Sequence, residues 1–246
     1  MAPLPQSQLF ALLQRVSRTF YWTLRFLPGQ VRPQIGLAYL LARATDTIAD
    51  TGLVPLDQRL LALETLRNRI LGHEPSPLQF SEFARHQGSP AERALLEQIE
   101  AILAHLDNFS AEDRGEVRGV LEIITSGQVL DLTRFGGGAA ERIAALESLA
   151  DLDDYTYRVA GCVGEFWSRM CRRHLFPHAA LNEAGWLARG VRFGKGLQLV
   201  NILRDLPAAL SRRSSTSPVS GLGSSYRPPC RPGRRRLGFR RPPNIL

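Results

Sequence analysis

The feature that most constrains the fold is a sharp change of character at Pro207. Over residues 7–205, apolar residues recur every three to four positions, which is the spacing of one face of a helix. After Pro207 the chain is rich in Ser, Pro, Gly and Arg and has no apolar period, so it cannot bury enough apolar surface to offset chain entropy. The sequence therefore predicts an all-α domain over residues 1–206 and a disordered basic tail over residues 207–246.

Leu- and Ala-rich segments in the first part predict successive helices, and no stretch alternates long enough to indicate a strand. Ser89 followed by Pro90, and Ser110 followed by Asp113, are typical of helix starts. We expect helices over residues 9–16, 35–49, 58–71, 90–106, 111–132, 146–171 and 181–206, with residues 72–89 mainly loop and residues 136–138 a flexible glycine break.

The net charge of +8 belongs to the tail. Residues 206–246 hold nine Arg, no Lys and no acidic residue, so the other residues sum to about −1. A near-neutral domain argues against a nucleic-acid partner. The tail has the charge to bind RNA or anionic lipid. Its composition is also what a GC-rich coding sequence gives in a wrong reading frame, and we favour this second interpretation.

Cysteine use and hydropathy bear on the compartment. Cys162, Cys171 and Cys230 match no zinc or disulfide spacing, which favours a reducing compartment. The sequence has neither an apolar run long enough to span a membrane nor the pattern of a signal peptide at its start. We therefore expect a cytoplasmic protein, with peripheral association with a membrane left open.

Asp46 and Asp50 lie four residues apart in a predicted helix, so their carboxylates leave the same face one turn apart. Alone they repel, but a divalent cation such as Mg2+ prefers oxygen ligands and would hold them beside a diphosphate. The alternative is a solvated helix face with Arg43 as an ion-pair partner. The apolar residues around the pair favour the metal site, because charges on a largely buried helix need a reason.

A second polar group occurs on the last predicted helix. Gln198, Asn201 and Asp205 share one face at spacings of three and four. Asn201 and Asp205 offer oxygen ligands, and Gln198 suits a phosphate or a water on a metal ion. A polar cluster at a helix end is the alternative. Together with the first pair, this group predicts two facing helices that share metal ions, as bundles commonly arrange them.

Two further segments carry candidate residues. In the run Ser17-Arg18-Thr19-Phe20 a guanidinium lies between two hydroxyls, which suits phosphate recognition, although a surface Arg is the alternative. Residues 159–164 are small and follow Tyr155. Such residues allow close helix packing, or they leave room for a long apolar substrate.

Taken in order, residues 17–20, 39–50, 155–164 and 198–205 resemble the squalene/phytoene synthase family. The amino-acid sequences of residues 46–50 and 201–205 look more like those of squalene synthases than of phytoene synthases. The resemblance implies an all-α isoprenoid synthase bundle around a central cavity. It implies that Mg2+ is bound by Asp46, Asp50, Asn201 and Asp205, that diphosphate is held by Ser17, Arg18, Tyr39, Arg43 and Gln198, that Phe20 lines the pocket, and that Tyr155, with Asp46 and Asp50, acts in catalysis.

The resemblance also implies a reaction. Two farnesyl diphosphates would condense head to head to presqualene diphosphate and then squalene, with NADPH for the reductive step, although no residue independently indicates a nicotinamide site. Two alternatives stay open. One is a phytoene synthase acting on geranylgeranyl diphosphate, and the other is a non-catalytic helical module that binds anionic partners through the Arg tail.

The chain departs from the family pattern near its end. The second acidic motif ordinarily has another Asp four residues after Asp205, but Ala209 stands there, and nothing after Pro207 resembles the family. We therefore expect a truncated bundle with little activity. Of the metal ligands expected on the last helix, only Asn201 and Asp205 would be present.

Overall fold

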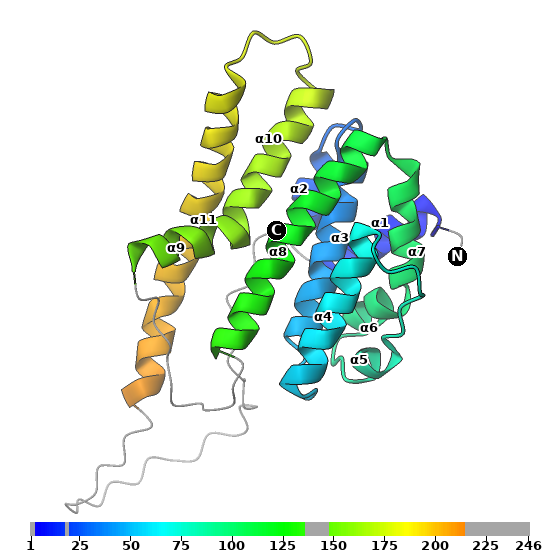
Figure 1. The fold of residues 1–246 in the computed structure, drawn as a ribbon, viewed down its shortest axis with the longest axis vertical. Coiled ribbons are helices and arrows are strands. Elements are labelled where there is room, and N and C mark those ends of the chain that lie inside the picture. The colour runs from blue at the N-terminus through cyan, green and yellow to red at the C-terminus, as the bar shows by residue number, and fades with distance from the viewer. Residues whose placement is uncertain (1–2, 18–19, 136–147, 215–246) are drawn as a thin grey trace, which may run out of the picture.

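The computed structural model describes residues 3–17, 20–135 and 148–214. Every regular element in these ranges is a helix, which confirms the predicted all-α class (Figure 1). The elements are α1 (Gln6–Ser17), α2 (Phe20–Phe26), α3 (Arg32–Ala49), α4 (Leu56–Leu71), α5 (Ser81–Arg85), α6 (Pro90–Glu97), α7 (Ile99–Leu103), the 3-10 turn η1 (Ala104–Asn108), α8 (Ala111–Phe135), α9 (Leu149–Thr156), the π turn η2 (Tyr157–Gly161), α10 (Cys162–His174) and α11 (Glu183–Ser214).

Short sequence signals account for several helix ends. Ser110 Oγ accepts a hydrogen bond from the Asp113 N–H at 3.1 Å at the start of α8, as its spacing predicted. Pro90 is a first-turn residue of α6, where its missing N–H costs nothing. Helix α4 ends at Gly72, whose φ of 85° lies in the left-handed region that favours glycine.

Three predicted segments have the expected type of structure but are more divided than predicted. The expected loop over 72–89 contains α5, because Phe80 and Phe83 bury their rings in the core and stack edge to face. The helix expected over 90–106 is broken at Gln98 into α6 and α7 and ends in η1. The segment 146–171 is divided by the π turn η2.

Helix α11 continues past Pro207 to Ser214. Residues 208–213 are Ala, Leu, Ser and Arg, and Ala, Leu and Arg are strong helix formers. Residues 215–246, which hold most of the basic tail, lie outside the described residues, as does the glycine break at 136–138. The domain boundary at residue 206 and the disorder of the tail therefore stay predictions.

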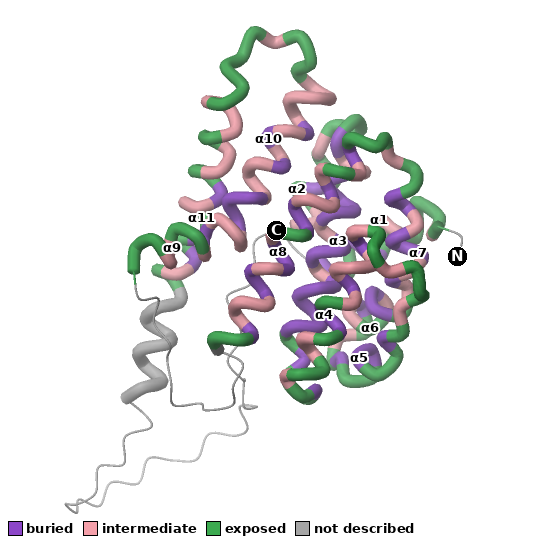
Figure 2. Tube along the Cα trace, in the orientation of Figure 1, coloured by how far each residue is buried: buried purple, intermediate pink, exposed green. Residues whose placement is uncertain are grey.

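Helix α3 is the centre of the bundle. It is buried along nearly its whole length (Figure 2), and Leu37, Leu40, Leu41 and Ile48 are fully enclosed. Helix α8 packs on both α3 and α4, α10 packs on α8, and α11 packs on α10 and η2. None of the described helices is long and apolar enough to span a membrane.

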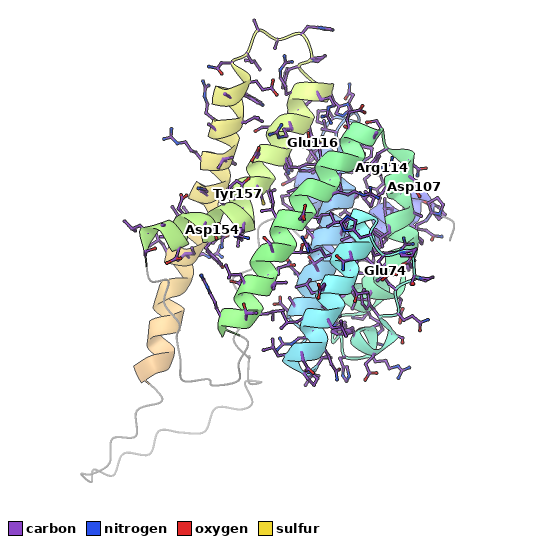
Figure 3. All side chains as sticks on the ribbon, in the orientation of Figure 1. Glu74, Asp107, Arg114, Glu116, Asp154 and Tyr157 are labelled. Carbon is purple, nitrogen blue, oxygen red and sulfur yellow. The ribbon has the colours of Figure 1, made fainter. Side chains whose placement is uncertain are left out.

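A buried polar cluster joins α3, α8 and α10. The Asp113 carboxylate on α8 accepts hydrogen bonds from Gln34 Nε2 of α3 and Arg173 Nη1 of α10, both at 2.9 Å, and His174 Nε2 lies 2.9 Å away. Arg173 Nη2 also donates to Glu116 Oε1 at 3.2 Å, where α8 faces α10 (Figure 3). The cluster therefore ties three helices together at one end of the bundle.

Glycines set the distance between α10 and α11. A Cβ on Gly164 would lie 2.0 Å from the Gly190 carbonyl oxygen, and one on Gly194 would lie 2.1 Å from the Ala160 oxygen. Real Cβ atoms do not come so close, so backbone lies directly on backbone. Of the two roles considered for the small residues at 159–164, the structure therefore supports close helix packing. The opposite face of α11 exposes Phe193, Val200 and Leu203.

Candidate active site

Four polar side chains form a stripe along α3. Tyr39, Arg43, Asp46 and Asp50 follow at intervals of four, three and four residues, so they lie on one face of the helix. Asp46 is only 3% exposed, whereas Asp50 caps the helix and is exposed. The two predicted metal ligands therefore lie one turn apart, one inside the bundle and one at its surface.

Asp46 is held from two sides. Its Oδ1 accepts a hydrogen bond from Gln128 Nε2 of α8 at 2.6 Å, and its Oδ2 lies 4.0 Å from Arg43 Nη1. Gln128 is itself 4% exposed. The carboxylate is thus fixed in direction by an amide and balanced in charge by a guanidinium.

Arg43 is positioned by Glu92 of α6, whose carboxylate accepts a hydrogen bond from Arg43 Nη2. Burial alone would lower the pKa of Arg43, but the carboxylates of Asp46 and Glu92 outweigh burial and raise this pKa. Arg43 Nε is buried and makes no hydrogen bond to the described residues. A charged guanidinium with a spare donor beside Asp46 is suited to bind an anion.

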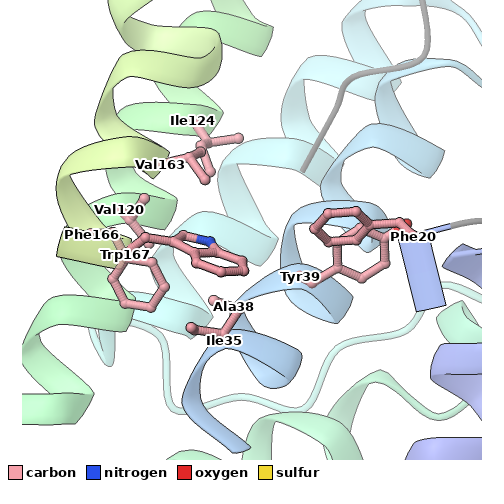
Figure 4. Close-up of a pocket in the computed structure, with 9 residues that line it drawn as sticks. All are labelled: Phe20, Ile35, Ala38, Tyr39, Val120, Ile124, Val163, Phe166 and Trp167. Carbon is pink, nitrogen blue, oxygen red and sulfur yellow. The ribbon is translucent and has the colours of Figure 1, made fainter. Parts of the chain in front are cut away.

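The stripe begins in an apolar hollow between α3, α8 and α10 (Figure 4). The Tyr39 ring stacks on Phe20 of α2 with centroids 5.2 Å apart, and burial raises the pKa of Tyr39 to about 12, which keeps its hydroxyl protonated. The cavity volume of the hollow is about 20 Å³, room for roughly one water molecule and far below the size of a small-molecule pocket. It is lined by Phe20, Ile35, Ala38, Tyr39, Val120, Ile124, Val163, Phe166 and Trp167.

The N-terminal candidates are less complete. Ser17, in the last turn of α1, is buried and donates its hydroxyl proton to the Leu13 carbonyl oxygen at 2.6 Å. The hydroxyl is therefore engaged within α1, and its predicted contact with diphosphate stays a prediction. Arg18 lies outside the described residues.

The second predicted wall is on α11. Gln198 and Asn201 are each 2% exposed, and Asn201 Nδ2 lies 3.5 Å from Gln198 Oε1. They share the helix face of Gly190 and Gly194, which packs on α10 and η2. Asp205 belongs to α11, but its side chain lies outside the description.

Tyr155 is half-buried in the last turn of α9, just before η2. Single π turns frequently occur at functional sites. Tyr157, the first residue of the turn, donates its hydroxyl to Glu165 Oε2 at 3.0 Å. Burial and this carboxylate raise the pKa of Tyr157 to about 12.

The family model for squalene/phytoene synthases matches residues 13–224. The chain belongs to the squalene/phytoene synthase family. The match covers both aspartate segments, the tyrosine segment on α9 and all of α11, in the order seen in the sequence. It continues to residue 224, so the expectation that nothing after Pro207 resembles the family was wrong.

Relatives within the family are squalene synthases. The chain is 26% identical to that of Schizosaccharomyces pombe over 198 residues, and 29% identical to that of Saccharomyces cerevisiae over 203 residues. These matches cover 80% of the chain but only 40% and 41% of the relatives. A solved structure of TcSQS with a ligand superposes with a TM-score of 0.64 at 25% identity, covering 81% of this chain and 53% of that one. The synthase fold is therefore confirmed over a part of its usual length.

The family resemblance implies a magnesium site, and the described residues bear on whether they fit one. They contain no group of three His, Cys, Asp or Glu that would enclose a cation by itself. The donor set around Asp46 nevertheless fits a hydrated Mg2+ ion, which keeps several waters and needs few carboxylates. Gln128 Oε1 beside Asp46 is buried without a hydrogen-bond partner among the described residues. Asp46 and Asp50 would hold the ion here, and the sharing of ions with Asn201 and Asp205 stays a prediction.

Two residues that contact the α3 stripe escaped the sequence analysis, Gln128 and Glu92. Both act through contacts between helices far apart in the chain, Gln128 with Asp46 and Glu92 with Arg43. Neither stands in a spacing that indicates a site. An amide in the apolar stretch of α8 was the single available hint.

Proposed function

We propose that the chain carries the diphosphate-activating part of a head-to-head prenyl synthase, with farnesyl diphosphate as substrate and Mg2+ as metal. The observation that carries the proposal is the continuity of the stripe on α3. Tyr39 borders an apolar hollow, and Arg43, Asp46 and Asp50 follow it on the same face. The side chains around the hollow would have to move apart to admit a prenyl tail, and a tail bound there would place its diphosphate at the charged end.

The residues divide the work as follows. Arg43 binds diphosphate oxygens through its spare donor, and Tyr39 donates a hydrogen bond from its protonated hydroxyl. The rings of Phe20, Phe166 and Trp167 exclude water and offer aromatic faces to an allylic cation. Mg2+, when bound, neutralises charge on the departing diphosphate. Tyr155 is proposed as the residue near the proton that is lost.

The finer parts of the proposal rest on the squalene synthases among the relatives and on the family resemblance. Squalene as product is supported by the names of these relatives. NADPH as reductant and a cytoplasmic location, with peripheral association with a membrane left open, are proposed from the family resemblance alone. We also propose low turnover, because Ala209 stands where the second acidic motif of the family has an aspartate.

The purified protein should be incubated with farnesyl diphosphate and Mg2+, with and without NADPH. We expect slow, Mg2+-dependent release of diphosphate that Asp46→Asn removes and Asp107→Asn, at an exposed position, leaves unchanged. Faster release from geranylgeranyl diphosphate would favour phytoene synthesis instead. Squalene formed at ordinary enzymatic rates would contradict the low turnover, and no release with either substrate would contradict the activity.

A further inference from the structure

Gln128 has a fixed orientation opposite Asp46. Its Nε2 lies 2.6 Å from Asp46 Oδ1. An ionised carboxylate only accepts hydrogen bonds, so the nitrogen of the amide must face Asp46 and the oxygen must point elsewhere. The side chain is 4% exposed, so bulk water does not solvate that oxygen.

The oxygen of this amide has no donor among the described residues. Gln128 Oε1 is buried and makes no hydrogen bond there. Because the two amide atoms share one carbon, Oε1 lies within about 5 Å of Asp46 Oδ1. Buried polar atoms are nearly always satisfied, and an exception indicates an absent water, ion or ligand. A donor is therefore expected close to the Asp46 carboxylate.

We propose that Gln128 is a positioning residue of the metal site, an inference that rests on the proposed function. Its Nε2 orients the Asp46 carboxylate, and its Oε1 accepts a hydrogen bond from a water of the hydrated Mg2+ ion held at Asp46. A separation of up to about 5 Å between the two oxygens leaves room for a bridge through a metal-bound water. Residues that orient ligands in this way tune the affinity for the metal.

The same bundle offers a matched control. Gln34 of α3 donates its Nε2 to Asp113 Oδ2 at 2.9 Å, is 8% exposed, and also has a buried Oε1 without a partner among the described residues. Asp113, however, accepts from Arg173 and faces His174. Two basic side chains lie 2.9 Å from Asp113, whereas the single guanidinium beside Asp46 lies 4.0 Å away, so a cation is more strongly disfavoured at Asp113. Both glutamines are thus buried and donate a hydrogen bond to a carboxylate, but we expect a metal ion only beside Gln128.

The test uses Mn2+ as a spectroscopic probe with inorganic pyrophosphate and the full chain. Electron paramagnetic resonance titrations give the Mn2+ affinity of the unaltered protein, Gln128→Met, Gln34→Met and Asp46→Asn. We expect Gln128→Met to weaken Mn2+ binding about 10- to 100-fold and Gln34→Met to leave it unchanged. Gln128→Glu keeps the shape and an acceptor, so it should bind Mn2+ at least as tightly and gain a larger rise in Tm from Mn2+ than the unaltered protein.

The results distinguish failure of the proposed role of Gln128 from failure of the proposed synthase function. Unchanged affinity in Gln128→Met, with loss in Asp46→Asn, would overturn the inference and leave the proposed function standing. Equal losses in Gln128→Met and Gln34→Met would also overturn it, because the effect would then be general destabilisation. Absence of Mn2+ binding by the unaltered protein with pyrophosphate would instead reject the proposed function. If Gln128→Met does not fold, the Gln128→Glu titration decides alone, and loss of Mn2+ binding in that variant overturns the inference.

Discussion

Asp113 and Arg173 join α8 to α10 through a hydrogen bond of 2.9 Å between Arg173 Nη1 and Asp113 Oδ1. The Asp113 side chain is 5% exposed, whereas that of Arg173 is 36% exposed. Gln34 and His174 complete the surroundings of this carboxylate. Three helices of the synthase bundle therefore depend on one charge.

Asp113→Asn should destabilise the fold. The change removes the charge that Arg173 and His174 face while keeping the shape, and we expect a loss of about 1–3 kcal/mol, since Arg173 is partly solvated. Urea unfolding followed by circular dichroism measures the loss. Asp107→Asn is the control, because Asp107 is 81% exposed and lies 3.7 Å from Arg114 (Figure 3). A loss as small as that of the control would refute the role of the cluster.

The same carboxylate predicts a pH dependence. Burial would raise the pKa of Asp113, but hydrogen bonds from Gln34, His174 and Arg173 outweigh burial and lower it below its ordinary value. A lowered pKa in the folded state contributes stability above the unfolded pKa of about 4, and this stability is lost as the pH falls through the folded pKa. The stability gap between the unaltered protein and Asp113→Asn should therefore narrow in acid. Urea midpoints from pH 7 to pH 3 would show it, and a constant gap would contradict it.

Gly164→Ala should separate α10 from α11. The new methyl group would lie 2.0 Å from the Gly190 carbonyl oxygen, where only backbone movement makes room. We expect a loss of more than about 3 kcal/mol or failure to fold. Gly115→Ala on α8 is the control, because its Cβ meets nothing within 4 Å, and it should gain up to about 1 kcal/mol from helix propensity. Thermal unfolding compares the two, and similar Tm values would exclude the close contact.

Arg43→Met should slow the release of diphosphate by about 100-fold, since it removes a donor from the site of developing negative charge. Arg67→Met is a suitable comparison. Arg67 of α4 is not part of the α3 stripe, and its Nη2 lies 2.7 Å from Glu122 Oε1 of α8. Single-turnover assays with farnesyl diphosphate report the rates. Equal rates of diphosphate release in the two variants would contradict the proposed role of Arg43.

Features that depend on residues close together in the chain could be predicted from the sequence. The Ser110 cap, the helix around Asp46 and the order of the motifs follow from local spacing. The contact between Gln128 and Asp46 could not be predicted, because the two residues lie on different helices and far apart in the chain. The short helix α5 was missed for a similar reason, since burial of Phe80 and Phe83 overrides the loop-like composition around them.

The backbone contact between Gly164 and Gly190 also bears on how this chain tolerates change over evolutionary time. Because main-chain atoms meet there, the placement of α11 depends little on the apolar side chains elsewhere in the bundle. Those side chains are free to drift while Gln198 and Asn201 remain in register with η2. This chain shares only about a quarter of its aligned residues with the squalene synthases of Schizosaccharomyces pombe and Rattus norvegicus. We expect the two glycines, rather than the apolar core, to fix the position of the second motif in this chain.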